Sequence, residues 1–465
     1  MSVKVTVYIP THNYGRFLDR AVQSVLAQTM EDWELIIVDD GSTDDTPEIL
    51  GRYRSHPKIR ILEQENKGLN VTNNIALRLA MGEYMMRLDA DDYLDENILL
   101  ILSNVLDTKP EVGLVYPDYY LVDEKGEVQE LVRRKKIGEE VDLLDLPAHG
   151  ACTMIRKEIL LDLGGYSEEF SRQDGYGLWL KFIQRYRPYN VNVPLFYYRQ
   201  HPNSLTQDRA RLLETRRQVK RRFVEGSNAT PLQVLAVVPV MADPPFTLGA
   251  PFTKLAGKPL IEYTLDEVVK AKLLTRTVLS SSSPEVLQAA GKYPGVVPLL
   301  RPRELAKQTA SVVDLLNHIL ASLEGDEGFR PDAICICYIN APFRQAGHID
   351  KAIDTMAIFD VDSVISVQEE LSLCYHHGRH GLAPLNGSRD RRMRLEREAI
   401  FKENAAIFLS RIEVIRAGRF LGDRIGHITM LPEESVRINS EFEFWMAEKI
   451  AIEREERRLT LENQG

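Results

Sequence analysis

Apolar and polar positions follow two alternating periods along roughly the first 200 residues of the chain. Short apolar runs bounded by turn residues are typical of strands, whereas apolar residues spaced three or four apart are typical of amphipathic helices. The predicted strands are 3–9, 33–38, 59–63 and 84–88, and the predicted helices are 14–28, 46–55 and 69–80. Strands that alternate with helices form a largely parallel sheet. The pattern therefore predicts an α/β domain that ends near Ser204.

The same alternation starts again at Leu232, with the apolar run LQVLAVVPV, and continues to about Leu459. A chain of 465 residues is too long for one hydrophobic core. We therefore predict a first domain over 1–205, a linker over 206–231 and a second domain over 232–465. Both domains are expected to be Rossmann-like α/β folds that bind nucleotides.

The predicted linker begins with a basic helix over 206–224, in which Leu212, Val219 and Phe223 form an apolar stripe. Two interpretations are open. The stripe packs on one of the domains, as the apolar faces of most surface helices do. Alternatively, the helix lies on an anionic membrane surface, where a basic amphipathic helix is stable.

Net charge and hydropathy argue against two classes of function, nucleic-acid binding and membrane spanning. The net charge of -10 argues against a nucleic-acid partner, because a phosphate-binding surface would tip the balance towards basic residues. No apolar stretch approaches the ~20 residues that span a bilayer. Met1 leads directly into the first strand without a signal-peptide pattern. We expect a cytoplasmic protein, with the basic helix as a candidate for peripheral contact at the inner face of the membrane.

The cysteines are sparse and lack the spacing of a zinc site; they are Cys152, Cys335, Cys337 and Cys374. Cys335 and Cys337 lie in an apolar strand, and we expect their side chains on opposite faces. The thiols are expected to be buried and reduced, because free cysteine is among the most buried residue types.

Two acidic clusters follow apolar strands in the first domain. The run IIVDDGSTDDT places Asp39 and Asp40 at the end of one strand, and YMMRLDADD places Asp89, Asp91 and Asp92 after another. Ligands of open α/β sheets bind outside the carboxyl ends of the strands. Two carboxylates separated by one residue can hold a hard divalent cation, which also takes oxygens from a diphosphate. The clusters therefore predict chemistry on a nucleotide-activated substrate.

Two further loops are predicted to reach the same edge. The run YIPTHN follows the first strand: Pro10 ends the strand, and Thr11 to Asn13 supply polar groups. The run ENKGLN places Gly68 before a helix whose amino terminus can face phosphate.

These motifs, in their order and spacing, resemble the family 2 glycosyltransferases, which have the GT-A fold. The similarity extends from about Val3 to Thr206 and includes PTHN, VDDGSTDDT, NKGLN, GEYMMRLDADDYL, RQDGYGLW and YYRQHPNSLT. The resemblance implies an inverting enzyme that uses Mn²⁺ or Mg²⁺. It implies that a sugar moves from a nucleotide-diphosphate sugar to a hydroxyl group.

The resemblance also implies a role for each matching residue. Pro10, Thr11 and Asn13 correspond to the nucleotide-contacting loop. Asp39 corresponds to the residue that reads the base, and Asp40 supports the same loop.

Asp89 and Asp91 correspond to the pair that holds the ribose and the diphosphate-bound metal. Asp174 corresponds to the general base that deprotonates the acceptor, and Arg199 and His201 to the loop that covers the diphosphate. The chain departs from the family in two places. Thr72-Asn73-Asn74 stand where relatives carry an arginine, and Gln173 precedes Asp174 where the family has glutamate.

The second domain resembles the sialic-acid cytidylyltransferases from about Leu232 to Ile450. The matching segments include LAGKPLIEYTLDEVVKA, PDAICICYINAPFR, FKENAAIFLSR and PEESVRINSEFEFWMAEKI. The loop that should grip a triphosphate reads VMADPPFTLGA and lacks the basic residues. Arg437 and Asn439 stand where the resemblance implies metal-binding aspartates. We therefore predict an inactive domain that serves assembly or recognition, and the resemblance implies a homodimer through it. A residual role in binding a nucleotide or a nonulosonic sugar is the open alternative.

The leading hypothesis is a glycosyltransferase of bacterial surface polysaccharide or flagellar glycan synthesis, acting on a glycan, a lipid-linked or a protein acceptor. The first alternative is a bifunctional enzyme that both activates and transfers a sialic-acid-like sugar. The second is a non-catalytic scaffold that recruits other glycan enzymes. The complete acidic set argues against the scaffold, and Arg437 and Asn439 argue against the bifunctional enzyme.

Overall fold

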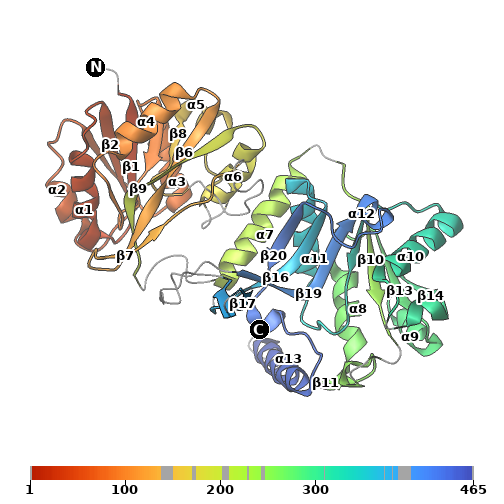
Figure 1. Ribbon diagram of the computed structural model, residues 1–465. Helices are drawn as coiled ribbons and strands as arrows, with labels where there is room; N and C mark the ends of the chain where they lie inside the picture. Colours follow the sequence, from red (N-terminus) through yellow and green to blue (C-terminus); the bar gives the residue numbers. More distant parts are fainter. Residues whose placement is uncertain are drawn as a thin grey trace. The chain divides into compact units, whose positions relative to one another are not determined.

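A computed structural model describes most of the chain and divides it into two compact units, Met1–Val219 and Lys220–Gly465. The described residues are 3–137, 150–169, 174–201, 209–227, 230–241, 244, 247–307, 309–370, 372–379, 381–385 and 400–462. Both units are mixed α/β structures (Figure 1), so the predicted fold class is confirmed. None of the described helices is long and apolar enough to cross a membrane.

The first unit is built on a mixed sheet in which the described strands have the order β3-β2-β1-β4-β8-β6-β9-β5, with β7 paired to β6. The strands are β1 (Val5–Thr11), β2 (Trp33–Asp39), β3 (Ile59–Glu63), β4 (Tyr84–Arg87), β5 (Tyr93–Leu94), β6 (Val112–Val122), β7 (Val128–Val132), β8 (Met154–Arg156) and β9 (Arg187–Arg199). β1 pairs in parallel with β2 and β4, and β2 pairs in parallel with β3. The carboxyl ends of these strands therefore share one edge of the sheet.

Helices cover both faces of this sheet. They are α1 (Gly15–Leu26), α2 (Thr46–Gly51), α3 (Leu69–Leu79), α4 (Ile98–Thr108), α5 (Lys157–Asp162) and α6 (Asp174–Ile183). Val7 on β1 belongs to a core with α1 and α4, whereas Tyr8 belongs to a core with α3, α5 and α6. This alternation is expected because successive strand residues point to opposite faces. Burial on both sides explains why β1 and β2 read as continuous apolar runs.

Helix α7 (Arg209–Glu225) contains the boundary between the two units, which lies inside the range predicted as a linker. In the first unit, the guanidinium of Arg216 lies over the Tyr176 ring, 5.4 Å from its centroid. In the second unit, the ammonium of Lys220 is buried and donates a hydrogen bond of 3.1 Å to Oγ1 of Thr355. Val219, from the predicted apolar stripe, is also buried.

The second unit contains a seven-stranded sheet of order β14-β13-β10-β15-β19-β16-β20 among the described residues. Its strands are β10 (Val234–Pro239), β13 (Arg276–Ser281), β14 (Val296–Leu300), β15 (Ala333–Ile336), β16 (Ser363–Glu370), β19 (Ile400–Arg411) and β20 (Ile425–Thr429). β10 pairs in parallel with β13 and β15, whereas β19 runs antiparallel to β15 and β16. The parallel part again brings the carboxyl ends of several strands to one edge.

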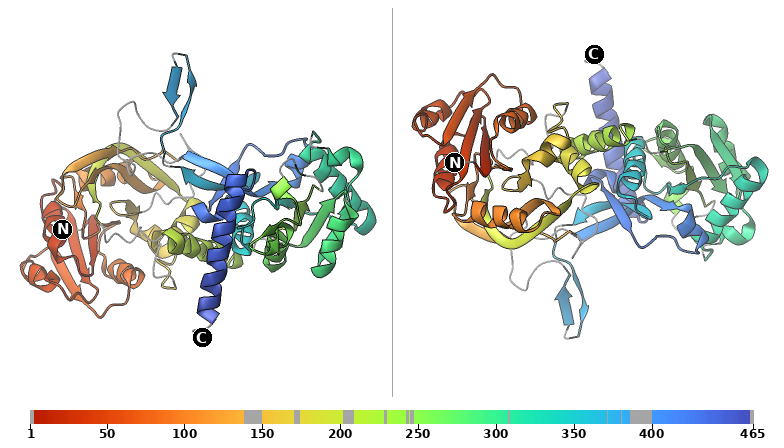
Figure 2. Two further views of the ribbon diagram at one scale, coloured as in Figure 1. Left: turned by 90° about the horizontal axis from the view of Figure 1, so that it is seen from below. Right: turned by 90° about the horizontal axis from the view of Figure 1, so that it is seen from above.

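The helices of the second unit are α8 (Leu260–Lys270), α9 (Pro284–Gln288), α10 (Val312–Glu327), α11 (Ala346–Phe359), α12 (Ile412–Arg416) and α13 (Glu441–Glu462). A short hairpin pairs β11 (Lys254–Leu255) with β12 (Lys258–Pro259). A second hairpin pairs β17 (Tyr375–Gly378) with β18 (Gly381–Pro384). Both views of Figure 2 show this second hairpin projecting from the body of its unit.

The placement of two cysteines corrects one expectation. The sulfur atoms of Cys335 and Cys337 are 3.8 Å apart, so these side chains share a face of the sheet rather than pointing to opposite faces. The prediction was wrong because residues two apart on a strand point the same way. Cys152, Cys335 and Cys337 are buried, Cys374 is half-buried, and all four are free thiols.

Candidate functional site

The carboxyl ends of β1, β2 and β4 bring the predicted loops of the first unit together. Thr11 is paired with Asp39 in the register of β1 and β2, and the Asp40 N–H donates to the Thr11 carbonyl oxygen at 2.9 Å. The Leu88 N–H donates to the Tyr8 carbonyl oxygen at 2.9 Å, which places the start of the DADD loop beside β1. Two acidic clusters about 50 residues apart in the sequence therefore meet at one edge.

The first two loops hold each other in place. Asn13 adopts a positive φ of 60°, and its Oδ1 accepts the N–H groups of Thr43 at 2.7 Å and Asp44 at 3.3 Å. The Asn13 N–H donates to Oγ of Ser42 at 2.9 Å. Asp39 is buried, and its Oδ1 accepts the Ser42 N–H at 3.0 Å. In this arrangement Asn13 and Asp39 shape the loop that follows β2.

The buried carboxylate of Asp40 fixes the third loop. Its Oδ1 accepts the Lys67 N–H at 2.8 Å and Nε2 of Gln64 at 2.7 Å, and its Oδ2 accepts the Gly68 N–H at 2.9 Å. Gly68 has a φ of 89°, a conformation that glycine adopts without a steric penalty, and it precedes α3. Asp40 and Gly68 together position the amino terminus of α3, which begins at Leu69.

Two of the three aspartates in the DADD loop, Asp89 and Asp91, contact a guanidinium and an imidazole, respectively. Asp89 Oδ1 lies 2.9 Å from Nε of Arg87, whose side chain is nearly buried at the end of β4. Asp91 Oδ2 lies 2.9 Å from Nε2 of His201. His201 is buried beside the rings of Tyr14 and Phe17, with ring centroids 5.8 and 5.4 Å away. The structure therefore joins residues 110 positions apart in the sequence.

Burial and like charge concentrate a negative potential at this loop. Burial raises the pKa of the Asp91 carboxyl, and the charge of Asp89 raises it further. Burial likewise raises the pKa of Tyr14 to about 12, with the charges of Asp91 and Asp89 as the next causes. Two nearby carboxylates disfavour each other's ionised state unless a cation is present.

Arg199, at the end of β9, holds the acidic loop through backbone oxygens. Its Nε donates to the Asp91 carbonyl oxygen at 2.8 Å, and its Nη1 donates to the Glu124 carbonyl oxygen at 2.7 Å. The Arg199 N–H donates to Oδ1 of buried Asp92 at 2.9 Å. Arg199 thus positions the loop that carries Asp91.

Two of the predicted site residues, Pro10 and Asp174, take no part in the side-chain contacts described above. Pro10 is buried within β1, which continues to Thr11 rather than ending at the proline as predicted. Proline is tolerated there because φ is compatible with an extended chain. Asp174 is the first residue of α6, and its side chain lies outside the described residues. Trp179 of the same helix is fully buried.

Sequence reasoning missed Arg87 and Tyr14 as parts of this site, and it placed Asp92 in the acidic cluster without a role. Arg87 stands two residues before Asp89, and Tyr14 directly follows Asn13, so proximity in the sequence was a usable signal. Asp92 forms part of the same acidic run. Burial raises its pKa well above the usual range, and its Oδ2 has no hydrogen-bond partner among the described residues.

The donor set fits a divalent cation that protein and substrate hold jointly. Asp89 and Asp91 provide carboxylate oxygens, whose mutual repulsion a cation would relieve. Among the described residues, no group of three acidic, histidine or cysteine side chains converges as a metal site. A hard cation here would therefore complete its shell with oxygens of a diphosphate or with water.

The residues that the second unit shares with the cytidylyltransferase pattern serve its structure. Arg344 is buried and donates to the Ala406 carbonyl oxygen at 2.7 Å and to Oγ1 of Thr264 at 2.8 Å. Ser311 caps α10 by accepting the Val313 N–H.

Parts of the chain are similar to known glycosyltransferases and polysaccharide synthases. The chondroitin synthase of Escherichia coli is 38% identical over 123 residues, which cover 26% of this chain and 18% of that protein. The glycosyltransferase GlyG of Streptococcus pneumoniae is 36% identical over 126 residues, covering 27% of this chain and 42% of that protein. The aligned part is only about a fifth of the length of the chondroitin and hyaluronan synthases that the chain matches.

A solved structure can be superposed on about half of the chain. The crystal structure of Staphylococcus aureus TarS 1-349 superposes with a TM-score of 0.40 at 19% identity, covering 49% of this chain and 67% of that one. Residues 6–164 match the family described as glycosyl transferase family 2, and residues 249–454 match the family described as cytidylyltransferase. Two separate parts of the chain therefore match two different families, glycosyl transferase family 2 and cytidylyltransferase.

Proposed function

We propose that the first unit is an inverting glycosyltransferase that moves a sugar from a nucleotide-diphosphate donor to a hydroxyl acceptor. The observation that carries this proposal is the meeting of Asp39, Asp89 and Asp91 at the carboxyl edge of β2 and β4. Strand ends of this kind are where α/β sheets bind nucleotides.

In this proposal each residue has a defined task. Asp39 accepts a hydrogen bond from the base, and Pro10, Thr11 and Asn13 shape the nucleotide loop. The Thr11 hydroxyl is buried and has no partner among the described residues, so it is available to a ligand. Asp40 and Gly68 orient the amino terminus of α3 towards the donor.

The chemical step uses the acidic loop and α6. Asp89 and Asp91 would hold Mn²⁺ or Mg²⁺, and the bound ion would neutralise charge that develops on the leaving diphosphate. Asp174 takes the proton from the acceptor hydroxyl as its oxygen attacks the anomeric carbon, and the bond from that carbon to the diphosphate oxygen breaks. Attack from the opposite face inverts the configuration. Arg199 and His201 keep the loop in place over the donor.

A hydrolysis assay tests the proposal. Full-length protein would be incubated with UDP-, GDP-, dTDP- and CMP-sugars in Mn²⁺ or in EDTA, and release of the nucleotide would be measured. We expect slow, metal-dependent release from one donor class, and stabilisation of the protein against heat by the same donor. Absence of both effects for every donor would contradict the glycosyltransferase proposal and favour the scaffold.

The acceptor and pathway are part of the same proposal. The relatives include enzymes named chondroitin synthase and hyaluronan synthase, which supports a role in polysaccharide synthesis at a bacterial surface. A glycan, a lipid-linked acceptor or a protein would then be the acceptor. Transfer to acceptors isolated from the source cell envelope would test it.

We further propose that the second unit forms a homodimer. The projecting hairpin exposes Tyr375 and Leu382, and α13 exposes Phe442 and Trp445, whose side chains are 66% and 55% accessible. Exposed large apolar groups on one domain are typical of interaction surfaces. Light scattering of the purified protein should give twice the chain mass, and Leu382→Asp together with Trp445→Asp should shift it towards the monomer.

A cytoplasmic location with peripheral membrane contact through 206–224 completes the proposal. Val219 and Lys220 are buried in the protein, so such contact would use the exposed basic residues Arg211 and Arg222 rather than the apolar stripe. Binding to vesicles with anionic lipids should then weaken steeply as salt is raised.

A further inference from the structure

Three aspartates lie within four consecutive residues of the loop that follows β4, and each has a partner inside the protein. These aspartates are Asp89, Asp91 and Asp92. Carboxylates this close repel one another unless positive charge or hydrogen-bond donors compensate them. Asp91 contacts the imidazole of His201, and Asp92 accepts the Arg199 N–H at 2.9 Å. Groups of the protein itself therefore supply part of that compensation.

The partner of Asp89 is a guanidinium that meets both of its carboxylate oxygens. Nε of Arg87 lies 2.9 Å from Oδ1 of Asp89, and Nη2 of Arg87 donates to Oδ2 at 3.4 Å. A planar guanidinium that faces a carboxylate in this way forms a strong and directional ion pair. Its charge is permanent, because an arginine side chain stays protonated in proteins. Arg87 is therefore a built-in cation for Asp89.

The fold leaves the Arg87 side chain little freedom to move away. Arg87 is the last residue of β4 and is paired with Tyr8 in the register of β1 and β4. Tyr8 is buried, and its hydroxyl lies 3.1 Å from the hydroxyl of Tyr166. The side chain of Arg87 is itself only 11% exposed. Burial and the ion pair together fix the guanidinium beside the start of the acidic loop.

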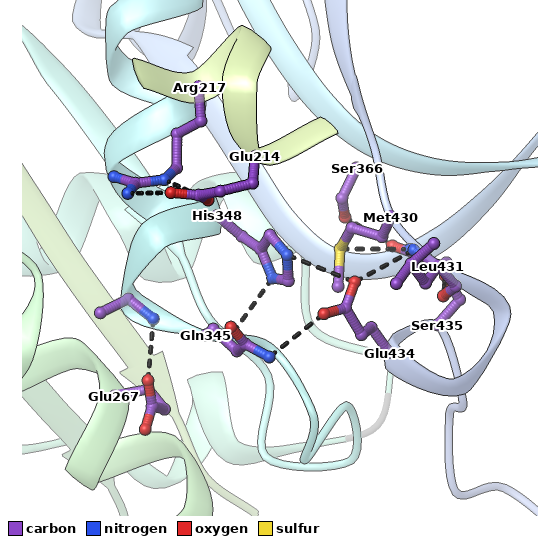
Figure 3. A network of polar contacts seen from close by, with 12 residues as sticks. Glu214, Arg217, Glu267, Gln345, His348, Ser366, Met430, Leu431, Glu434 and Ser435 are labelled. Atoms are coloured by element: carbon purple, nitrogen blue, oxygen red, sulfur yellow. Dashed lines mark hydrogen bonds and ion pairs between the residues drawn. The ribbon is translucent and has the colours of Figure 1, made fainter. Parts of the chain in front are cut away.

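A carboxylate that only holds chain segments together has different contacts, as Glu434 of the second unit illustrates. Glu434 accepts the Leu431 N–H at 3.0 Å and Nε2 of Gln345 at 3.1 Å, and its Oε2 lies 3.4 Å from Nε2 of His348 (Figure 3). Its side chain is 11% exposed, whereas that of Asp89 is 31% exposed. A ligand can therefore reach the carboxylate of Asp89.

The ion pair sets a condition on the binding of a divalent cation. A metal ion at Asp89 would lie close to the positive charge of Arg87, and like charges at such short range repel each other. It would also compete with the guanidinium for the same carboxylate oxygens. A diphosphate reduces both costs, because its negative oxygens neutralise the metal ion and complete its ligand shell. A metal ion that binds together with a diphosphate is thus favoured over a free one.

We propose that Arg87 is the resident counter-ion of the acidic loop and makes binding of the divalent cation depend on the donor diphosphate. Arg87 holds Asp89 in position before the donor binds, and its charge lowers the affinity of the loop for a free metal ion. The metal ion and the diphosphate then bind cooperatively, and each raises the affinity for the other by the same factor. This inference rests on the proposed glycosyltransferase function and concerns how its ligands bind.

Binding of Mn²⁺ to the full-length protein tests the proposal. Electron paramagnetic resonance measures free Mn²⁺ directly and requires no catalytic turnover. Titrations would be run without nucleotide and with UDP, GDP, dTDP or CDP, after subtraction of the Mn²⁺ that each nucleotide binds alone. We expect one nucleoside diphosphate to tighten Mn²⁺ binding to the unmodified protein at least tenfold. Equal affinities with and without every nucleoside diphosphate would contradict the proposal.

Arg87→Gln provides the decisive variant. Without nucleotide, loss of the positive charge should tighten Mn²⁺ binding about tenfold, because a nearby repulsive charge is removed. A merely structural role of Arg87 predicts the opposite, since a displaced Asp89 would weaken Mn²⁺ binding. Unchanged or weaker binding in Arg87→Gln would therefore overturn the proposal.

Arg60→Gln is the matched control for the loss of an arginine. Nη2 of Arg60 lies 2.6 Å from Oε2 of buried Glu34, near the amino ends of β3 and β2 and thus at the opposite edge of the sheet. We expect this variant to bind Mn²⁺ as the unmodified protein does. Equal tightening in Arg60→Gln and Arg87→Gln would contradict a specific role of Arg87.

Arg87→Lys keeps the proposal testable if heat denaturation shows that Arg87→Gln is unfolded. Lysine retains the charge and loses the planar fork, so Mn²⁺ binding without nucleotide should stay within threefold of the unmodified protein. Tenfold tighter binding in Arg87→Lys would overturn the proposal. The variants are compared without nucleotide, so the role of Arg87 can fail while glycosyl transfer holds. Failure of every nucleoside diphosphate to bind any variant would instead overturn both proposals.

Discussion

The loop after β4 in the first unit presents Asp89 and Asp91, whereas the segment before α13 in the second unit presents Arg437 and Asn439. Both lie at the carboxyl edge of a mainly parallel group of strands. The first edge combines the carboxylate of Asp89 with that of Asp91, whose pKa is raised by burial, and with a neighbouring imidazole. The second carries the exposed guanidinium group of Arg437 and the exposed amide of Asn439. Similar sheet architecture therefore presents side chains of opposite charge at the strand ends of the two units.

The largest expected effect would come from removing charge at the acidic edge. Asp91→Asn should lower metal-dependent hydrolysis and transfer on the order of a thousandfold, because neutralisation of the leaving diphosphate is worth several kcal/mol. Steady-state rates with the preferred donor would measure it. Asp32→Asn is the control, since Asp32 is exposed and precedes β2 at the opposite edge. Equal rates in the two variants would contradict the proposed role of Asp91 at the acidic edge of the first unit.

The proposed general base should have the next largest effect. Asp174→Asn should reduce transfer by about a hundredfold or more, because the acceptor hydroxyl loses its proton acceptor. Thermal stabilisation by the donor should remain, since the donor-binding residues are unchanged. Undiminished transfer would remove Asp174 from the proposal.

Removing the charge of Asp40, a carboxylate with a structural role, should have a smaller effect, and on stability rather than on activity. Asp40→Asn would turn an amide N–H₂ towards the N–H donors of the 64–68 loop, so the free energy of unfolding should fall by about 2 kcal/mol. Urea denaturation would measure it. An equal fall in the free energy of unfolding for Asp32→Asn would show that the hydrogen bonds of Asp40 do not account for the effect.

The smallest effect concerns a buried carboxylate in the second unit that lies on α11. Burial raises the pKa of Asp354 to about 6 from its usual 3.8, although Arg221 lowers it in part, and its Oδ2 has no partner among the described residues. Because the folded state prefers the protonated form, this stabilisation is complete below pH ~4 and is lost as the pH rises through about 6.

Asp354→Asn removes the ionisation. The variant should therefore be more stable than the unmodified protein by roughly 1–2 kcal/mol at pH 8, with little difference at pH 4. Urea denaturation at the two pH values would measure it. A larger difference at pH 4 than at pH 8 would contradict the assigned direction.

Much of the fold follows from local patterns. The predicted strands 33–38 and 59–63 agree with β2 and β3 within a residue, because buried apolar runs bounded by turns have few alternatives. The predicted helix 46–55 is shorter in the structure, where α2 ends at Gly51. Helix ends depend on capping and packing more than on apolar spacing.

The sequence by itself determined the order of strands and helices and the position of acidic residues at strand ends. It also carried the family motifs, because these are local in the chain. Only the tertiary structure decided that Asp91 contacts His201 and that Asp40 closes the 64–68 loop. These contacts join residues that are distant in the sequence. Strand pairing and burial bring them together, and burial then sets their pKa values and the charge that a ligand meets.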